Sequence, residues 1–355
     1  MSERKSPVRL AVLGLGWVGG RVWLPMLLDN PDFEVVALLD PNREALQAAR
    51  ALFPTVRPHA DPDDLDPSEV DLAVVAVPNH LHTTIATQLL RRGISTFVEK
   101  PVCLTGAEAA ELAAAERAGG ATVLAGSAAW HRADVKALRA QLDGLGELRA
   151  VELSWVRSKG IPGGSWFTNR TLAGGGALFD VGWHLVNIGM RMLSWPRVSQ
   201  VCGSVSADFV GRDGFGADWR SAASGDTTCG AGVEDTARAC LVTEDGVLVW
   251  LHVAWASHTE VDRTRIAVEG SAGRAELECT FGFSTNRLSG SRLVVHRNGR
   301  QERIPVPAEE VGAEYRRQLG LLPTLLADPG QPGAATAEAA RTVALVDRIY
   351  RSARG

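Results

Sequence analysis

Short apolar runs alternate with longer amphipathic stretches over residues 8 to 126. Runs such as VRLAVLG, FEVVALLD and DLAVVAVP place hydrophobic side chains at consecutive positions, which is typical of strands buried on both faces of a parallel sheet. Segments such as REALQAARALF and HTTIATQLLRRG lie between these runs and have the spacing of helices. This alternation predicts an α/β domain with a doubly wound parallel sheet.

The pattern changes after residue 129. A helical segment, ADVKALRAQL, precedes separated strand-like runs, and Glu-Asp-Gly and Arg-Asn-Gly turns favour hairpins of an antiparallel sheet. The last twenty or so residues again have helical spacing. We therefore expect three parts, residues 1–127, 128–330 and 331–355, with the last packing back on the first. The Gly- and Ser-rich stretch 211–232 is expected to be a long mobile loop.

Composition narrows the class of protein. The 355 residues are 45% hydrophobic and 22% charged, with a net charge of -4, so neither nucleic acid nor an anionic membrane is an expected partner. The N-terminus lacks an apolar signal region, and no run approaches the roughly eighteen apolar residues of a membrane helix, so we expect a cytoplasmic protein. Five scattered cysteines, without a CxxC pair, are expected to be buried, reduced and structural, and no metal is expected.

A glycine motif, GLGWVG, stands between the first strand and the first helix. Gly14 permits a tight turn, Gly16 lets the backbone approach a pyrophosphate, and Gly19 allows close packing. Trp17 and Val18 lie inside the motif, where the free N–H groups of the helix N-terminus face the phosphates. The alternative is a plain strand-to-helix turn, but the context favours dinucleotide binding.

Asp40 ends the second strand about twenty residues further on, where a carboxylate can accept both ribose hydroxyls of a dinucleotide. A carboxylate would repel a 2′-phosphate, so Asp40 favours NAD. Arg43 keeps NADP open, because its guanidinium can cover the adenine or grip that phosphate. Alternatively, Asp40 belongs to the N-terminal end of the following helix.

Lysine is rare in this chain: only four of the 37 basic residues are lysines. One of them, Lys100, lies in FVEKP at the carboxyl end of a predicted parallel strand, the edge where ligands bind in open α/β sheets. Pro101 restricts the backbone just after it. The pKa of a lysine near a cofactor can be lowered, and the lysine can donate a hydrogen bond to a reacting oxygen. Arginine does both less well. The alternative is a surface lysine that ends a strand.

Asp180 and His184 are four residues apart in LFDVGWHLVN. On a helix they share one face, where the carboxylate can orient the imidazole and raise its basicity, as in a general base. A purely structural hydrogen bond is the alternative. Three glycines at 174–176 favour catalysis, because such a loop can bring the backbone close to a ligand.

These elements together resemble the Gfo/Idh/MocA family, named for glucose-fructose oxidoreductase and inositol dehydrogenase. The resemblance rests on GLGWVGG, AVPNHLH, VEKP, GGGALFDVGWHLVN and the terminal AEAARTVALVDRIYRSA. It implies an N-terminal dinucleotide-binding Rossmann domain over 1–127. It also implies a substrate-binding α+β domain over 128–330, whose large, mostly antiparallel open sheet forms a homodimer or homotetramer.

The resemblance also implies roles for the candidate residues. Lys100 would lie beside the nicotinamide and the substrate, and His184 would be the general acid/base, with Asp180 and Lys100 completing the polar network. Asn187 stands where the family often has aspartate, so it can hydrogen-bond a substrate hydroxyl but cannot act as a base.

Further contacts are expected from residues that match the family's segment beneath the nicotinamide, from the EKP motif, and from the glycine-rich turn before the GGG loop. For Asn79 a helix cap is the alternative, and for Trp166 a core position. The candidate cofactor contacts are Pro78, Asn79, His82 and Glu99, and the candidate substrate contacts, for a sugar or phosphate, are Arg157, Lys159 and Trp166.

The resemblance implies an NAD(P)-dependent dehydrogenase or ketoreductase acting on a secondary alcohol or ketone of a sugar, nucleotide-sugar or cyclitol. The arginine- and alanine-rich composition is typical of high-GC bacteria, where such enzymes build antibiotic sugars and aminocyclitols. The alternative is a dinucleotide-binding regulatory protein of the same family, without turnover. The presence of Lys100, Asp180 and His184 favours the enzyme; the substrate, the direction and the release of the cofactor stay open.

Overall fold

The computed structural model describes residues 6–28, 30–164, 166–220 and 232–355. Half of the expected long loop, residues 221–231, lies outside the described residues. The chain forms two compact units. The first comprises Met1–Ser127 and Arg316–Val343, and the second comprises Ala128–Tyr315 and Ala344–Gly355.

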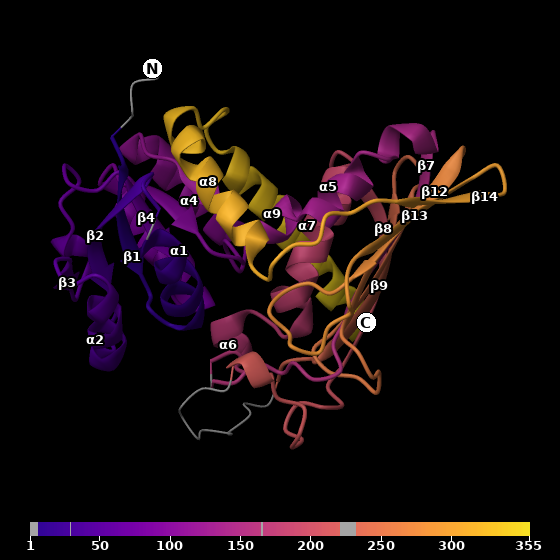
Figure 1. Cartoon of the computed structure of the whole chain (residues 1–355), viewed down its shortest axis with the longest axis horizontal. Helices are drawn as coiled ribbons and strands as arrows, with labels where there is room; N and C mark the ends of the chain where they lie inside the picture. Colours follow the sequence, from indigo (N-terminus) through magenta and orange to yellow (C-terminus); the bar gives the residue numbers. More distant parts are fainter. Residues whose placement is uncertain (1–5, 29, 165, 221–231) are drawn as a thin grey trace. The chain divides into compact units, whose positions relative to one another are not determined.

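In the described residues of the first unit, six parallel strands form one sheet, and helices cover it (Figure 1). Strand order reverses between β1 and β4, so a crevice is expected at the carboxyl ends of these two strands, where ligands bind in such sheets. The strands in sheet order are β3 (Arg57–His59), β2 (Phe33–Leu39), β1 (Val8–Leu13), β4 (Leu72–Val75), β5 (Ser95–Val98) and β6 (Val123–Ala125).

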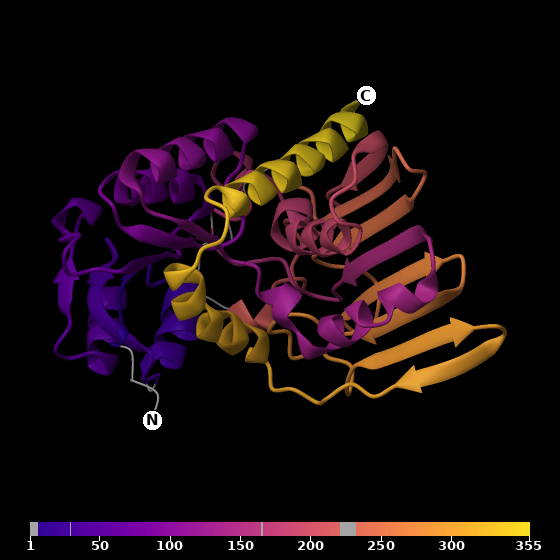
Figure 2. The same cartoon turned by 90° about the horizontal axis from the view of Figure 1, so that it is seen from above.

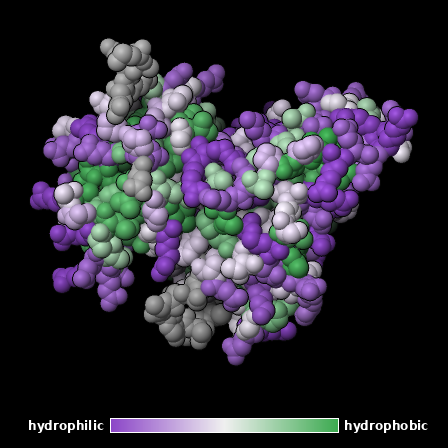
Figure 3. Space-filling model, viewed as in Figure 1, coloured by the Kyte–Doolittle hydropathy of each residue, from purple (hydrophilic) through white to green (hydrophobic). Residues whose placement is uncertain are grey.

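The helices of the first unit follow the strands as the sequence pattern predicts. All four residues of β4 are buried, because helices cover both faces of the sheet. Hydrophobic residues also gather on the face of the first unit drawn in Figure 3. Leu28 of α1 and Leu52 of α2 are 44% and 38% exposed. The helices are η1 (Gly19–Trp23), α1 (Leu24–Leu28), α2 (Arg43–Leu52), η2 (Pro62–Asp64), η3 (Asn79–Leu81), α3 (His82–Arg91) and α4 (Gly106–Gly119), with most of α8 (Ala313–Ala327) and the first part of α9 (Ala334–Arg354).

Within the described part of the second unit, eight strands form a sheet in which each neighbouring pair except β7 and β10 is antiparallel. The fold class expected from the sequence is therefore confirmed. The strands in sheet order are β14 (Arg300–Ile304), β13 (Arg292–Arg297), β12 (Gly273–Cys279), β11 (Arg263–Gly270), β7 (Leu148–Val156), β10 (Leu248–Ala254), β9 (Thr236–Thr243) and β8 (Val198–Ser206).

Helices of the second unit lie on one face of this sheet (Figure 2). Helix α7 (Trp183–Met192) contacts β7 and β10, and α5 (Ala133–Arg139) contacts β12 and β13. The end of α9 covers β8, where the Oγ of Ser352 accepts a hydrogen bond from the backbone N–H of Gly203. The short helices are η4 (Ala128–His131), η5 (Leu142–Leu145), α6 (Arg170–Ala173), η6 (Leu178–Gly182) and η7 (Asp218–Arg220).

Turn chemistry agrees with the expected hairpins. Gly246 turns the chain between β9 and β10 with a φ of 84°. Asn298 and Gly299 have φ angles of 52° and 71° between β13 and β14, the left-handed conformations of a tight hairpin turn.

The expectation for the cysteines was partly wrong. Cys103 and Cys279 are buried, but Cys202 is exposed and Cys240 is half-buried, because these two face each other on the open side of β8 and β9. The fifth, Cys229, lies outside the described residues. Over the ranges that the structure covers, no helix is long and apolar enough to cross a membrane.

Candidate active site

The three motif glycines of the first unit differ in their surroundings. Gly14 has a φ of 88°, and a Cβ added there would collide with the carbonyl of Ala76. A Cβ at Gly19 would overlap the carbonyl oxygen of Gly14. Apart from Gly16 and its two chain neighbours, no described residue has an atom within 4 Å of the position that a Cβ of Gly16 would occupy. Packing therefore requires the outer glycines, while the middle one leaves the backbone open to a ligand, as a pyrophosphate-binding turn requires.

This turn leads directly into a helical segment. Trp17 and Val18 are its first residues, and η1 and α1 continue it. The N–H groups and the dipole at such a helix start favour an anion. The residues present therefore fit the pyrophosphate of a dinucleotide.

Asp40 links the end of β2 to the glycine turn. Its Oδ2 accepts a hydrogen bond from the backbone N–H of Leu15 at 2.6 Å, and its Oδ1 accepts one from Asn42 at 2.7 Å. The cap of α2 is Asn42 rather than Asp40, because the Asn42 side chain accepts from the first backbone N–H groups of the helix. A carboxylate has about four acceptor sites, so Asp40 retains capacity for ribose hydroxyls. Arg43 is exposed as the first residue of α2.

Glu99, an expected cofactor contact, is buried and bonded within the protein. Its Oε1 accepts a hydrogen bond from Nε1 of Trp23 at 2.9 Å, and its Oε2 accepts one from the backbone N–H of Lys100 at 3.0 Å. Trp23 is fully buried, and its ring packs edge-on against Phe97. Glu99 therefore ties the helix after the glycine turn to the loop that carries the half-buried Lys100, whose bond to Pro101 is cis.

His82 also holds this loop. Its Nδ1 lies 2.7 Å from the carbonyl oxygen of Pro101, and its Nε2 lies 2.8 Å from that of Val77. Burial lowers the pKa of His82. Both ring nitrogens thus face main-chain carbonyls, and a cofactor could reach one only by displacing it. Asn79 is buried as the first residue of η3, and Pro78 occupies the capping position before it.

Asp180 and His184 lie on one continuous helical segment of the second unit, formed by η6 and α7. The two residues are 9% and 8% exposed, and their spacing places them on one face. Nε1 of Trp255, which is fully buried, donates a hydrogen bond to Oδ2 of Asp180 at 2.9 Å. Nη1 of Arg157 lies 3.9 Å from the same oxygen.

Residues along β7 and just beyond it contact residues of this helical segment at matching intervals. Arg157, just beyond the strand, meets Asp180, and the ring of Trp155 lies 5.8 Å from the ring of His184. Leu153 occupies the space that a side chain at Gly189 would fill. Two residues along a strand advance about 6.7 Å, and four or five along a helix about 6 to 7.5 Å, so the pairing persists over successive turns.

The Arg157 guanidinium lies between two indole rings, 5.0 Å from that of Trp155 and 5.2 Å from that of Trp219. Its side chain is 9% exposed. Gly282 lies beside this packing with a φ of 73°, and a Cβ there would be in ordinary contact with the Trp155 ring at 3.4 Å. The loop of Gly282 is held by Arg287, which donates to the carbonyl oxygens of Gly282 and Thr280.

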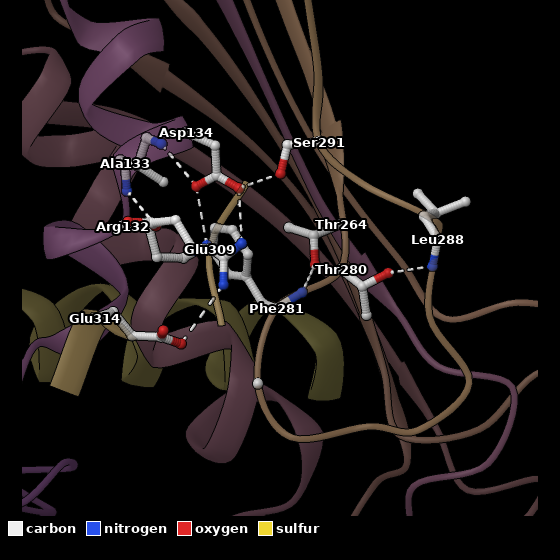
Figure 4. Close-up of polar contacts among 12 residues, drawn as sticks. Arg132, Ala133, Asp134, Thr264, Thr280, Phe281, Leu288, Ser291, Glu309 and Glu314 are labelled. Carbon is white, nitrogen blue, oxygen red and sulfur yellow. Dashed lines mark hydrogen bonds and ion pairs between the residues drawn. The ribbon is translucent and has the colours of Figure 1, made fainter. Parts of the chain in front are cut away.

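A buried ion-pair cluster anchors both ends of this loop (Figure 4). Arg132 donates two hydrogen bonds to Asp134 and lies 3.5 Å from Glu314, while its guanidinium covers the ring of Phe281. Ser291 also donates to Asp134, at 2.7 Å. Although burial opposes it, these bonds lower the pKa of Asp134. The cluster thereby fixes the wall beside Trp155 and Arg157.

The glycines before η6 serve a different purpose from the expected one. A Cβ at Gly175 would overlap the hydroxyl of Tyr350, and one at Gly176 would overlap the main chain of Glu234. The Glu234 carboxylate accepts hydrogen bonds from the backbone N–H groups of Gly176 and Leu178, both at 3.0 Å. These glycines therefore permit close protein packing that holds the start of the Asp180 segment.

The remaining candidates occupy separate positions. Asn187 is buried on α7, three residues after His184. Trp166 is half-buried with its ring 3.7 Å from that of Phe167, and Lys159 is exposed. Lys100 belongs to the first unit, whereas Asp180 and His184 belong to the second.

In the ranges that the structure describes, no group of three or more His, Cys, Asp or Glu side chains is placed to hold a metal.

The sequence did not signal three residues that hold Glu99, Asp180 and the start of η6 in place. Trp23, Trp255 and Glu234 lie 76, 75 and 58 residues from the partners they bond. No local pattern signals such pairs. The available hint is general: a buried indole N–H usually finds an acceptor.

The glycine turn with Asp40, on a parallel sheet of this order, defines a dinucleotide-binding Rossmann domain. Residues 8–127 match the model of the "Oxidoreductase family, NAD-binding Rossmann fold", and residues 135–276 match that of the GFO/IDH/MocA C-terminal domain. The chain belongs to the GFO/IDH/MocA family. The family, the enzyme class and the nicotinamide cofactor expected from the sequence are therefore confirmed.

Two curated relatives align over nearly the whole chain. A protein of Amycolatopsis mediterranei (strain S699), assigned as the oxidoreductase subunit of UDP-kanosamine synthase, is 52% identical over 98% of this chain and 96% of its own. The dTDP-3,4-didehydro-2,6-dideoxy-alpha-D-glucose 3-reductase of Streptomyces antibioticus is 26% identical over 98% and 97%.

A solved structure shares the fold. GenD2 from gentamicin A biosynthesis, determined in complex with NAD, superposes with a TM-score of 0.77 and covers 99% of this chain and 96% of its own. At 24% identity this similarity shows the fold alone.

Proposed function

We propose that the protein transfers hydride between NAD(P) and a secondary alcohol or ketone on the sugar ring of a nucleotide-linked hexose. The observation that carries the proposal is the buried Asp180–His184 pair in a chain that also has a dinucleotide-binding turn. Both relatives described above are named for nucleotide-linked sugars, which supports this substrate class. The reductase name supports carbon 3 as the reacting position.

The residues have separate tasks in the proposed reaction. The open backbone at Gly16 would accept the pyrophosphate, and Asp40 the adenosine ribose. When bound, the nicotinamide supplies the hydride acceptor or donor. His184 takes the proton of the substrate hydroxyl during oxidation, or returns it during reduction, while Asp180 orients the imidazole. Lys100 donates a hydrogen bond to the reacting oxygen.

The direction we propose is oxidation of a UDP-hexose to a ketone. The relative with 52% identity is named for the synthesis of an amino sugar, and a ketone is the functional group that amination requires. A separate aminating reaction would consume the product. We propose a role in bacterial secondary metabolism, and the cytoplasmic location predicted from the sequence is part of this proposal.

We also propose that the open face of the second sheet forms a homodimer or homotetramer. Trp250 is 50% exposed there, beside the side chains of Cys202 and Cys240. A large exposed aromatic residue at the centre of a sheet is typical of an interface.

The test is nicotinamide absorbance with the oxidised forms of NAD and NADP, against UDP-glucose, dTDP-glucose, free glucose and myo-inositol. Turnover of a nucleotide-sugar above the free sugar supports the proposal. Turnover of inositol alone would move the assignment to a cyclitol dehydrogenase. Bound dinucleotide without turnover of any sugar or cyclitol supports the regulatory alternative.

Two variants test the roles. Lys100→Met and His184→Asn should each abolish most turnover and keep dinucleotide binding, because neither changes the glycine turn. Lys136→Met is the matched control, since Lys136 is an exposed lysine on α5. Unchanged turnover in His184→Asn would exclude it as the acid/base.

A further inference from the structure

Asp180 can orient His184 only if its own carboxylate is held in one orientation. Two groups of the second unit converge on one oxygen of this carboxylate. Trp255 Nε1 donates to Oδ2 at 2.9 Å, and an Nη1 of Arg157 lies 3.9 Å from Oδ2. A direct hydrogen bond and a nearby positive charge on the same oxygen restrict rotation of the carboxylate.

Contacts of its main chain fix the position of Trp255. It directly follows β10, and its backbone N–H donates to the carbonyl oxygen of Asp235 at 2.8 Å. Its own carbonyl lies against Gly160, where a Cβ would be 2.9 Å from the oxygen. The side chain is fully buried, so the indole has one accessible orientation.

The Asp180 end of the bond is equally fixed. The backbone N–H of Asp180 donates to the carbonyl oxygen of Gly176 at 3.0 Å, and Gly176 is itself bonded to the Glu234 carboxylate. The separation between the indole and the carboxylate is therefore set by the scaffold on both sides.

We propose that Trp255, assisted by Arg157, is a positioning residue that fixes Asp180 and acts on His184 through it. This inference rests on the proposed function, because it assigns a role within that reaction. Simple core packing is the competing explanation. The two differ in one atom: packing needs the ring, whereas positioning needs the indole N–H.

The experiment compares full-length wild type with Trp255→Phe, Asp180→Asn, the double variant, and Trp183→Phe. Trp183 is a buried tryptophan next to His184 on α7, so its variant controls for the loss of an indole. kcat and KM are measured with the nucleotide-sugar found for wild type, over a range of pH.

We expect Trp255→Phe to lower kcat by about tenfold, with KM for the dinucleotide within about twofold of wild type. The double variant should be no slower than Asp180→Asn, because residues that act through one another are not additive. Multiplicative effects in the double variant, or equal losses in Trp255→Phe and Trp183→Phe, would overturn the proposal.

A second readout separates failure of this inference from failure of the proposed function. If wild type turns over no nucleotide-sugar, the proposed function fails, but the pKa of His184 can still be followed by NMR of the imidazole nitrogens, assigned with His184→Asn. We expect Trp255→Phe to shift the His184 titration in the same direction as Asp180→Asn. A His184 titration that moves in neither variant, or in Asp180→Asn alone, contradicts the inference.

Discussion

The hydroxyl of Tyr350 donates a hydrogen bond to Oε1 of Glu234 at 2.7 Å, although 116 residues separate the two along the chain. Tyr350 lies near the end of α9, and Glu234 lies two residues before the start of β9. The same carboxylate holds the backbone N–H groups at the start of η6. The end of the chain thus supports the segment that carries Asp180.

We expect Tyr350→Phe to lower the free energy of unfolding by about 1–3 kcal/mol, because a buried carboxyl group loses one of its donors. Burial raises the pKa of Glu234 and also keeps water away from its carboxylate, so water does not replace the lost hydrogen bond. Denaturant unfolding measures the change. Tyr315→Phe, at the other tyrosine of the chain, is the matched control and should have a smaller effect. Equal losses in both variants would contradict this role.

Alanine at Gly16 and at Gly19 should have opposite effects. Gly19→Ala should destabilise the fold, since its Cβ would overlap the main chain, whereas Gly16→Ala should change stability by less than about 0.5 kcal/mol. Gly16→Ala should instead weaken dinucleotide binding, because the methyl group occupies the approach of the pyrophosphate. Thermal unfolding and fluorescence titration with NADH distinguish the two. Undiminished affinity in Gly16→Ala would show that the turn does not hold the cofactor.

The preference for NAD over NADP should depend on Asp40. We expect Asp40→Asn to weaken NAD binding by about tenfold, equivalent to about 1.4 kcal/mol, while NADP is affected less because a negative charge is removed. The amide can still accept from the backbone N–H of Leu15, so the turn should persist. Arg43→Ala should weaken NADP rather than NAD. Titrations with both dinucleotides measure this, and an unchanged NAD to NADP ratio would argue against the carboxylate.

Acidification should destabilise the first unit through His82. Burial lowers the pKa of this imidazole below its usual value near 6.5, so the folded state holds it neutral. Below pH 6.5 the unfolded chain gains a proton that the folded chain does not, so this contribution to stability is lost as the pH falls toward the folded pKa.

The measurement is urea unfolding of wild type and His82→Gln between about pH 5 and 8. The difference in free energy of unfolding between the two should shrink as the pH falls. His59→Gln, on the edge strand β3, is the control. A difference that does not depend on pH would show that His82 titrates alike in both states.

Much of the fold was predictable because its signals are local. Consecutive apolar residues mark β1 and β4, Asn-Gly marks the turn between β13 and β14, and the glycine motif marks its own strand-turn-helix unit. Each depends on residues within a few positions of one another. The spacing of Asp180 and His184 was readable for the same reason.

Other features of the site depend on the tertiary environment. The glycines at 174–176 suggested a backbone open to ligand, but Gly175 and Gly176 are filled by Tyr350 and Glu234. Glu99 was expected to contact the cofactor, which stays a prediction, but no local pattern signalled that its carboxylate accepts a hydrogen bond from Trp23. In each case the deciding atom comes from a distant segment.

The sequence by itself determined the alternation of elements, the turns, the dinucleotide motif and the candidate reacting residues, because helical and strand periodicity and turn chemistry act over short distances. Only the tertiary structure decided what holds those residues: Trp23 on Glu99, Trp255 and Arg157 on Asp180, and Glu234 at the start of η6. Buried carboxylates need donors at hydrogen-bonding distance, and which donors reach them depends on how strands and helices far apart in the chain come together.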